Sequence, residues 1–352
     1  MNRTEWLSVP VGAGAANWVT RRVRRTVVVA VHTVVSGQRL LDVVGLVESD
    51  PEVQVVYACA PDVFRGGVDS FLYEIGALRI PWRQAAHERF DLVLAAAHGS
   101  LHELRGPVMV LPHGAGFAKK TPRSGDHDRP ANHSIYGLGA DHLTWDGRVI
   151  PTSIVLSHDA QRDLLARQCP EALGAALVAG DPSYDRLLAS SGLRSDYRAA
   201  LGVAGEQRLV VVASTWGRHS LLSRYQDLLC RLARQLDPRR YRLALLAHPA
   251  LWFGHGRRQV YAWLADERAA GVLLIEPEVD WRAVAVAADF VVGDSRPGQV
   301  RAACGRSARH TGPAARGRRP GPVASLRSGR NSHRPTIPPY RVRRRRHRWP
   351  GR

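Results

Sequence analysis

The chain has 352 residues, of which 45% are apolar, enough for two ordinary domains with sizeable cores. Its formal net charge of +19 would by itself suggest a nucleic acid or an anionic membrane as partner. However, residues 296–352 contain 17 arginines and no acidic residue, which leaves 33 basic against 31 acidic side chains in the preceding 295 residues. The net charge is therefore not evidence for specific nucleic-acid binding. We expect residues 1–295 to form an ordinary soluble, cytoplasmic enzyme.

The cysteines and the longest apolar run exclude two further classes. The four cysteines are far apart and show no CxxC spacing, so neither a zinc site nor a disulfide framework is expected. The longest apolar run, residues 26–35, is well short of the roughly 20 residues that span a bilayer. It is rich in β-branched residues, which favours a buried strand.

In the first half of the chain, short apolar runs alternate with amphipathic stretches, as is typical of βαβ units and a parallel sheet. The pattern predicts helices over 37–48, 61–75 and 159–168. It predicts strands over 25–35, 52–59, 91–95, 108–111, 153–156 and 176–178. Residues 119–150 are polar, rich in glycine and histidine, and aperiodic, which indicates a long functional loop.

A polar stretch over residues 190–205 is interpreted as a linker, after which the alternation resumes. It predicts helices over 221–236, 257–269 and 281–288, and strands over 208–213, 242–247, 272–275 and 290–292. We therefore expect an α/β protein of GT-B type: a Rossmann-like, parallel-sheet domain over 1–190 and a second, incomplete one over 206–295. Ligands are expected beyond the carboxyl ends of the strands.

Five strand ends carry side chains suited to chemistry. His113-Gly114 follows the strand at 108–111, where a glycine lets a ligand approach the backbone and a histidine can act as a general base. A tight turn with a solvated imidazole is the structural alternative. Turns, N-caps and edge histidines explain the other four motifs equally well; these are Gly180-Asp181-Pro182, Ser214-Thr215-Trp216, His248-Pro249 and Gly293-Asp294-Ser295.

In this order and at these positions, the five motifs resemble those of the CDP-glycerol glycerophosphotransferase family of teichoic-acid-type polymerases and primases, over about residues 90–294. The resemblance implies a GT-B fold and transfer of glycerol phosphate, or a related polyol phosphate, from a CDP-activated donor to a polyol or glycan hydroxyl. It implies a CDP-linked donor substrate but no cofactor and no metal. It is also compatible with a lipid-linked acceptor and peripheral association at the inner membrane face.

By the same resemblance, His113 with Gly114 is expected to be catalytic, the imidazole taking the proton of the attacking hydroxyl. The donor is expected to contact the remaining motif residues, which are Gly180, Asp181, Ser214, Thr215, His248 and Asp294. Three positions depart from the family pattern, because Ser183 replaces an arginine, Ala213 a proline and Gly217 a charged residue. These departures indicate a divergent branch and leave the exact donor and acceptor open.

Residues 296–352 do not continue the α/β pattern. Arg, Pro, Gly and Ala supply 38 of these 57 residues, so the segment cannot bury enough apolar area to offset its ordering entropy, and a disordered tail is expected. The same four amino acids are those whose codons begin with two G/C bases, which favours a frameshift near residues 295–297. The second domain would then lack its last elements, leaving the strand at 290–292 uncovered and the transferase impaired.

Two other functions remain open from the sequence. The first is a GT-B glycosyltransferase or epimerase that uses a sugar nucleotide, since one fold hosts many activities. The second is a non-catalytic remnant whose basic tail is genuine and binds anions.

Overall fold

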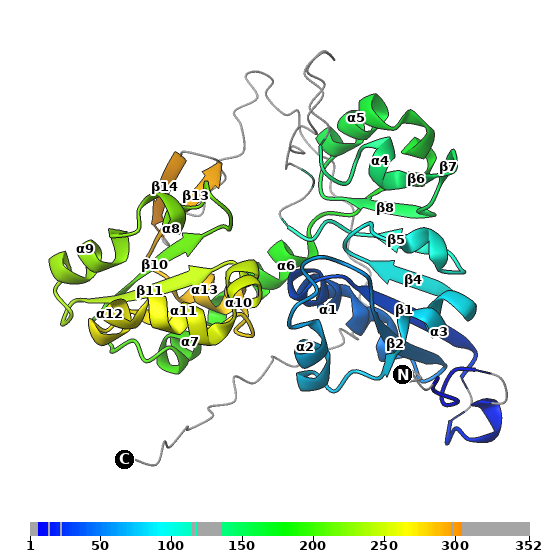
Figure 1. Ribbon diagram of the computed structural model, residues 1–352, viewed down its shortest axis with the longest axis horizontal. Coiled ribbons are helices and arrows are strands. Elements are labelled where there is room, and N and C mark those ends of the chain that lie inside the picture. Colours follow the sequence, from blue (N-terminus) through cyan, green and yellow to red (C-terminus); the bar gives the residue numbers. More distant parts are fainter. Residues whose placement is uncertain are drawn as a thin grey trace, which may run out of the picture. The chain divides into compact units, whose positions relative to one another are not determined.

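Two β-sheets, one in each half of the chain, organise the computed structural model (Figure 1), which describes residues 6–12, 15–21, 23–114, 117, 135–296 and 299–304. The chain divides into two compact units. The first holds residues 1–192 with 247–266 and 276–278, and the second holds 193–246, 267–275 and 279–352. The predicted domain boundary near residue 190 therefore falls beside the boundary at Gly192, although short segments from later in the chain group with the first unit.

The first sheet has seven strands in the order β3-β2-β1-β4-β5-β8-β9, and every pair is parallel. The strands are β1 (Arg25–Val31), β2 (Val53–Cys59), β3 (Arg79–Ile80), β4 (Leu92–Ala95), β5 (Val108–Val110), β8 (Ser153–Leu156) and β9 (Ala176–Val178). The chain builds outward from β1 to β3, then crosses to the other side of β1 at β4. The switch point of the topology thus lies between β1 and β4, where open α/β sheets bind ligands.

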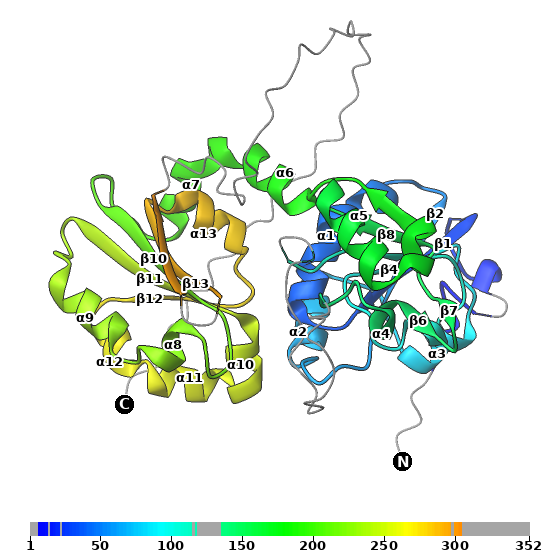
Figure 2. The ribbon, with the colours of Figure 1, turned by 90° about the horizontal axis from the view of Figure 1, so that it is seen from above.

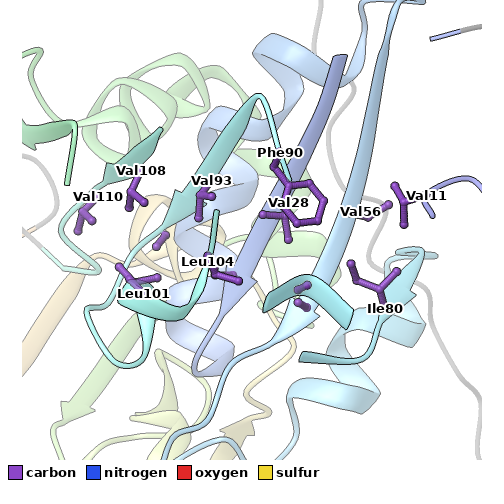
Figure 3. Packing of buried hydrophobic residues seen from close by; sticks show 14 residues of the cluster. Val11, Val28, Val56, Ile80, Phe90, Val93, Leu101, Leu104, Val108 and Val110 are labelled. Atoms are coloured by element: carbon purple, nitrogen blue, oxygen red, sulfur yellow. The ribbon is translucent and has the colours of Figure 1, made fainter. Parts of the chain in front are cut away.

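Both faces of this sheet are covered, which explains why its strands are continuous apolar runs. Figure 3 shows one face, where Val28, Val56 and Val93 of three adjacent strands lie with Phe90 and Leu101 in one buried cluster. The opposite face packs against the helices after β1 and β2. Their ranges, with the other helices of this half, are α1 (Val34–Glu48), α2 (Val68–Glu74), α3 (Trp82–His87), α4 (Ala140–Leu143), α5 (Asp159–Gln168) and α6 (Pro182–Ala189).

Helix α1 begins at a capping box directly after β1. The Thr33 hydroxyl accepts from the Ser36 N–H at 3.1 Å, and the Ser36 hydroxyl accepts from the Thr33 N–H at 2.9 Å. Leu40 and Val44 of this helix are fully buried against the sheet, and each such side chain contributes about 1.5–3 kcal/mol of transfer free energy. The first residue of α1 and its orientation on the sheet are therefore fixed. The positions from which its polar side chains extend are fixed with them.

The second sheet has the order β12-β11-β10-β13-β14. Its strands are β10 (Arg208–Ser214), β11 (Tyr241–Ala247), β12 (Leu273–Ile275), β13 (Phe290–Arg296) and β14 (Gln299–Cys304). Figure 2 shows α7 and α13 on one face of it and α8 and α9 on the other. The helices of this half are α7 (Arg194–Ala200), α8 (Leu221–Arg224), α9 (Leu228–Gln235), α10 (Pro249–His255), α11 (Arg257–Trp263), α12 (Ala265–Ala269) and α13 (Trp281–Ala287).

The expected α/β architecture with one sheet in each half of the chain is confirmed, and several predicted boundaries are wrong. The linker at 190–205 contains α7, the predicted helix 61–75 is only Val68–Glu74, and the predicted helices 221–236 and 257–269 are each divided in two. Residues 119–134 of the predicted loop lie outside the described residues, whereas 135–150 hold α4 and the hairpin of β6 (Thr144–Trp145) and β7 (Arg148–Val149). Within the described residues, no helix is long and apolar enough to cross a membrane.

The C-terminal end of the second sheet differs from one further expectation. The strand at 290–292 was expected to lack a neighbour, but β13 pairs with β14 in an antiparallel register that places Phe290 opposite Cys304 and Val292 opposite Ala302. The first residues of the arginine-rich segment therefore form the edge strand of this sheet. The rest of that segment, 305–352, lies outside the described residues.

Candidate active site at the carboxyl edge of the first sheet

Three histidines follow three neighbouring strands at the switch point of the first sheet. His32 directly follows β1, His98 lies three residues after β4, and His113 lies three residues after β5. Because these strands are parallel neighbours, their carboxyl ends meet at one edge of the sheet. The predicted His113-Gly114 turn therefore belongs to a cluster of imidazoles, two of which the sequence analysis did not single out.

His98 is the centre of this cluster. Its ring lies 6.2 Å from the Tyr136 ring and 5.7 Å from the His142 ring, measured between centroids. Desolvation, followed by the neighbouring His142, His32 and His113, lowers the pKa of His98 to about 3. Burial likewise lowers the pKa of His32, whose Nε2 lies 2.7 Å from the Gly99 carbonyl. Both imidazoles are therefore neutral near pH 7.

Three buried nitrogens in and beside the cluster have no hydrogen-bond partner among the described residues. They are the Nδ1 atoms of His32, His98 and His142. His142 Nδ1 lies 2.9 Å from an Asp141 carboxylate oxygen but makes no hydrogen bond to it. Unsatisfied buried polar atoms are costly and cluster at functional sites.

His113 stands at the solvent side of the cluster. Its side chain is half-buried, and its ring meets the Tyr136 ring edge-on at 5.8 Å between centroids. Gly114 is exposed, and a Cβ added there would meet no atom within 4 Å. Among the described residues, nothing lies against the outer side of Gly114, as the approach of a substrate to a general base requires.

A buried arginine holds the backbone of this turn. Arg39, on α1, is only 4% exposed. Its Nε donates to the Pro112 carbonyl at 2.9 Å, and its Nη2 donates to the Gly114 carbonyl at 3.2 Å. The guanidinium therefore donates hydrogen bonds to the carbonyls of the residues on both sides of His113. These bonds fix the backbone that carries the imidazole.

The same guanidinium reaches the second predicted motif. Arg39 Nη1 lies 2.6 Å from an Asp181 carboxylate oxygen, and Asp181 also caps α6 by accepting from the Ser183 N–H. Gly180 has a φ of +86°, a left-handed conformation that favours glycine. Gly180 and Asp181, which are expected from the sequence to bind the donor, form a helix-capping turn that is tied to the His113 turn through Arg39.

The network also accounts for the departure at Ser183. The Ser183 hydroxyl donates to Asp42 at 2.5 Å, and Arg186 Nη1 lies 3.1 Å from the same carboxylate. The Asp42 side chain is 1% exposed, and Arg39 Nη1 lies 3.9 Å from it. A buried carboxylate requires such partners. Arg39 and Arg186 therefore supply the positive charge beside the buried Asp42 carboxylate.

In the second unit, the predicted residues Thr215 and Asp294 meet at the end of β10. The Asp294 carboxylate accepts from the Thr215 N–H at 2.8 Å and from the Thr215 hydroxyl at 2.9 Å. It also accepts from the Leu221 N–H at 2.5 Å. The Asp294 carboxylate thus accepts from both Thr215 donors, although Thr215 is expected from the sequence to contact the donor substrate, and Asp294 shapes the loop that precedes α8.

Ser214 and His248 have structural contacts of their own. The Ser214 hydroxyl accepts from the Leu222 N–H at 3.2 Å and donates to the Thr215 carbonyl. His248 follows β11, and its Nδ1 accepts from the Ala250 N–H at 3.1 Å, which makes it the N-cap of α10. Its Nε2 is therefore the nitrogen that can carry a proton for a ligand.

The described part of the chain contains no group of three or more His, Cys, Asp or Glu side chains placed to hold a metal ion. The structure brings His113 and Gly114 together with Gly180 and Asp181, and brings Thr215 together with Asp294. Sequence reasoning missed Arg39, His32, His98 and Tyr136. One signal was available, because Ala97-His98-Gly99 repeats after β4 the His-Gly pair that follows β5.

Comparison with known proteins gives the fold. No family model and no curated protein matches the chain. The wall teichoic acid polymerase TagF, in a structure soaked with CDPG, superposes with a TM-score of 0.51 at 12% identity, over 76% of this chain and 65% of that one. This chain therefore spans less than two thirds of the TagF chain.

Two further structures are similar over the same share of the chain, 76%. MnaA from S. aureus, in a co-structure with UDP, has a TM-score of 0.47, 12% identity and 73% coverage of its chain. The UDP-GlcNAc 2-epimerase from Methanocaldococcus jannaschii has a TM-score of 0.45, 12% identity and 77% coverage. With its two Rossmann-like sheets and its likeness to TagF, the chain has a GT-B-type fold.

Proposed function

We propose that this protein is a transferase that moves glycerol phosphate, or a related polyol phosphate, from a CDP-activated donor to an acceptor hydroxyl. The observation that carries the proposal is the His113 turn, held by Arg39 at the switch point of the first sheet. The motif order along the chain and the likeness in fold to TagF, whose structure contains CDPG, support the choice of donor.

In this proposal His113 takes the proton of the acceptor hydroxyl as its oxygen attacks the phosphorus of the polyol phosphate. The new P–O bond joins the acceptor, the P–O bond to the cytidine monophosphate breaks, and the proton stays on His113 until solvent removes it. Catalysis then depends on positioning and electrostatics. The neutral His32 and His98 suit this role, because they add no positive charge that would oppose protonation of His113.

On the donor side, the loop after β10 is the proposed contact for the pyrophosphate, with His248 Nε2 as an additional donor. Asp294 supports the loop and does not touch the donor in this proposal, since its oxygens accept from Thr215 and Leu221. No metal or cofactor is invoked. Backbone N–H groups and imidazoles would offset the charge that develops on the leaving phosphate.

The donor is tested first, by calorimetric titration of the full chain with CDP-glycerol, UDP-GlcNAc and a GDP-sugar. We expect CDP-glycerol to bind at least tenfold more tightly, a difference of about 1.4 kcal/mol. Preference for a sugar nucleotide would favour the glycosyltransferase or epimerase alternative. Binding of none of the three would refute a donor site and favour a non-catalytic protein.

The base is tested next with His113→Ala, compared with His87→Ala as a matched control. His87 is exposed, and its Nδ1 lies 2.7 Å from the Arg83 carbonyl, outside the imidazole cluster. We expect His113→Ala to lower turnover by at least 100-fold while CDP-glycerol binding is retained, whereas the control is unchanged. Turnover equal to that of the control would remove His113 from the role.

A further inference from the structure

The amino edge of the second sheet carries a cavity that the proposed transfer reaction does not use. It has a volume of about 270 Å³ and is lined by Glu206, Arg208, Arg239, Arg240 and Tyr241. These residues flank the starts of β10 and β11, whereas the proposed donor loop follows the end of β10. The seven residues of β10 separate the two ends by roughly 20 Å.

The walls of this cavity are joined by backbone and side-chain hydrogen bonds. The Arg208 N–H donates to the Arg240 carbonyl at 2.7 Å, and Gln207 Nε2 donates to the Pro238 carbonyl at 2.7 Å. On the second wall, Asp237 accepts from the Arg239 N–H at 2.9 Å. The two segments that carry the arginines are thus held side by side.

The charges of the cavity are unbalanced. No ion pair of the described residues involves Arg208, Arg239 or Arg240, whereas Arg194, Arg198 and Arg231 of the same unit each pair with an aspartate. The guanidinium carbon of Arg208 lies 6.0 Å from the centroid of the Phe290 ring. The residues that line the cavity thus include three arginines but one carboxylate, that of Glu206, and all four residues are exposed. Like charges held together without partners favour an anion between them.

We infer that this cavity is a binding site for a phosphate-bearing group. Guanidinium groups match phosphate oxygens with paired N–H donors, and several arginines around a small volume favour a dianion over a single carboxylate. Glu206 can accept hydrogen bonds from hydroxyl groups beside the phosphate, so a phosphate ester with free hydroxyls fits better than a bare phosphodiester chain. A phospholipid headgroup and a soluble phosphate ester share this chemistry.

The experiment follows the reaction of individual arginines with phenylglyoxal in the full chain by mass spectrometry. Exposed Arg83, Arg162 and Arg167 of the first unit are internal references, since no ion pair of the described residues involves them. Pyrophosphate at about ten times its Kd should slow modification of the three cavity arginines about tenfold relative to the references. Vesicles of phosphatidylglycerol, compared with phosphatidylcholine, test the lipid source in the same way.

Calorimetry with pyrophosphate checks the result on variants of equal charge. Arg208→Gln with Arg239→Gln and Arg240→Gln should remove one binding site, whereas Arg83→Gln with Arg162→Gln and Arg167→Gln should keep it. Protection by vesicles alone assigns a lipid headgroup, and protection by pyrophosphate alone assigns a soluble phosphate ester. Equal protection of cavity and reference arginines, or equal binding by both triple variants, would overturn the inference. CDP-glycerol binding reports on the proposed function separately.

Discussion

Replacement of Arg39 by methionine tests the central contact of the candidate site. Methionine has a similar length and keeps the apolar packing of the side chain. It removes the hydrogen bonds to the Pro112 and Gly114 carbonyls and the ion pair with Asp181. Asp42, whose side chain is 1% exposed, also loses a nearby cation. Breaking a buried ion pair from one side costs about 3–5 kcal/mol, because a charge stays buried without its partner.

The free energy of unfolding is measured by urea denaturation, with hydrogen exchange of β1 and β5 as a local readout in the first unit. Arg186→Met is the comparison variant: it removes the ion pair at 3.1 Å to Asp42 but leaves Arg39 and Ser183 in place, so a smaller loss of about 1.5–3 kcal/mol is expected. Arg39→Lys should fall between the two, because a single ammonium cannot reach all three partners. If Arg39→Met costs no more than Arg186→Met, the network does not hold the His113 turn.

Three further predictions concern the imidazole cluster and the donor loop. The pKa of His98 is about 3 in the folded chain and near 6.5 in the unfolded chain, so the unfolded chain binds more protons between these pH values. The free energy of unfolding should therefore fall by about 2 kcal/mol from pH 7 to pH 5. In urea titrations, His98→Leu should remove this part of the pH dependence. Asp294→Ala should speed hydrogen exchange over 215–221 and lower the free energy of unfolding by about 1–3 kcal/mol. Thr215→Val loses only the hydroxyl contact and should lower it less. Equal exchange in both variants would contradict the proposed support of the loop. Gly137→Ala should destabilise the first unit by about 1–3 kcal/mol, because φ is +86° and the new Cβ would lie 2.8 Å from His98 Nε2. Thermal unfolding measures this loss, and Gly174→Ala is the control because the Cβ added there meets nothing within 4 Å.

The strands of both sheets could be predicted because their apolar runs are nearly uninterrupted, as burial on both faces requires. Helix α7 could not. The linker around it is locally polar, but Arg194 and Arg198 pair with Asp289 at 2.8 and 2.7 Å, and Arg194 also donates to the Ala288 carbonyl. These partners lie about 90 residues further along the chain, so no local pattern reveals that the arginines are bound rather than solvated.

The candidate site was predictable to a similar degree. A strand end followed by His-Gly is visible in the sequence, and the same reasoning would have found His98. Arg39 was not visible, because an arginine on an amphipathic helix is usually solvated, and only the packing of α1 turns it inward. Asp294 was identified, yet its role as an acceptor for Thr215 depends on the adjacency of β10 and β13, which the motif alone does not show.

The Asp42 contacts also constrain the order in which the first unit can fold. Ser183 and Arg186 lie 141 and 144 residues away from Asp42 along the chain. Closing loops of this length is entropically costly, and such contacts form late when nearer ones can form first. The strand and helix around residues 25–48 are therefore expected to form first, while the Asp42 carboxylate and the Arg39 guanidinium are still hydrated. The contacts with α6 form afterwards. A chain halted before α6 could still join Arg39 to the Pro112 and Gly114 carbonyls, but Asp42 would lack Ser183 and Arg186, and Arg39 would lack Asp181.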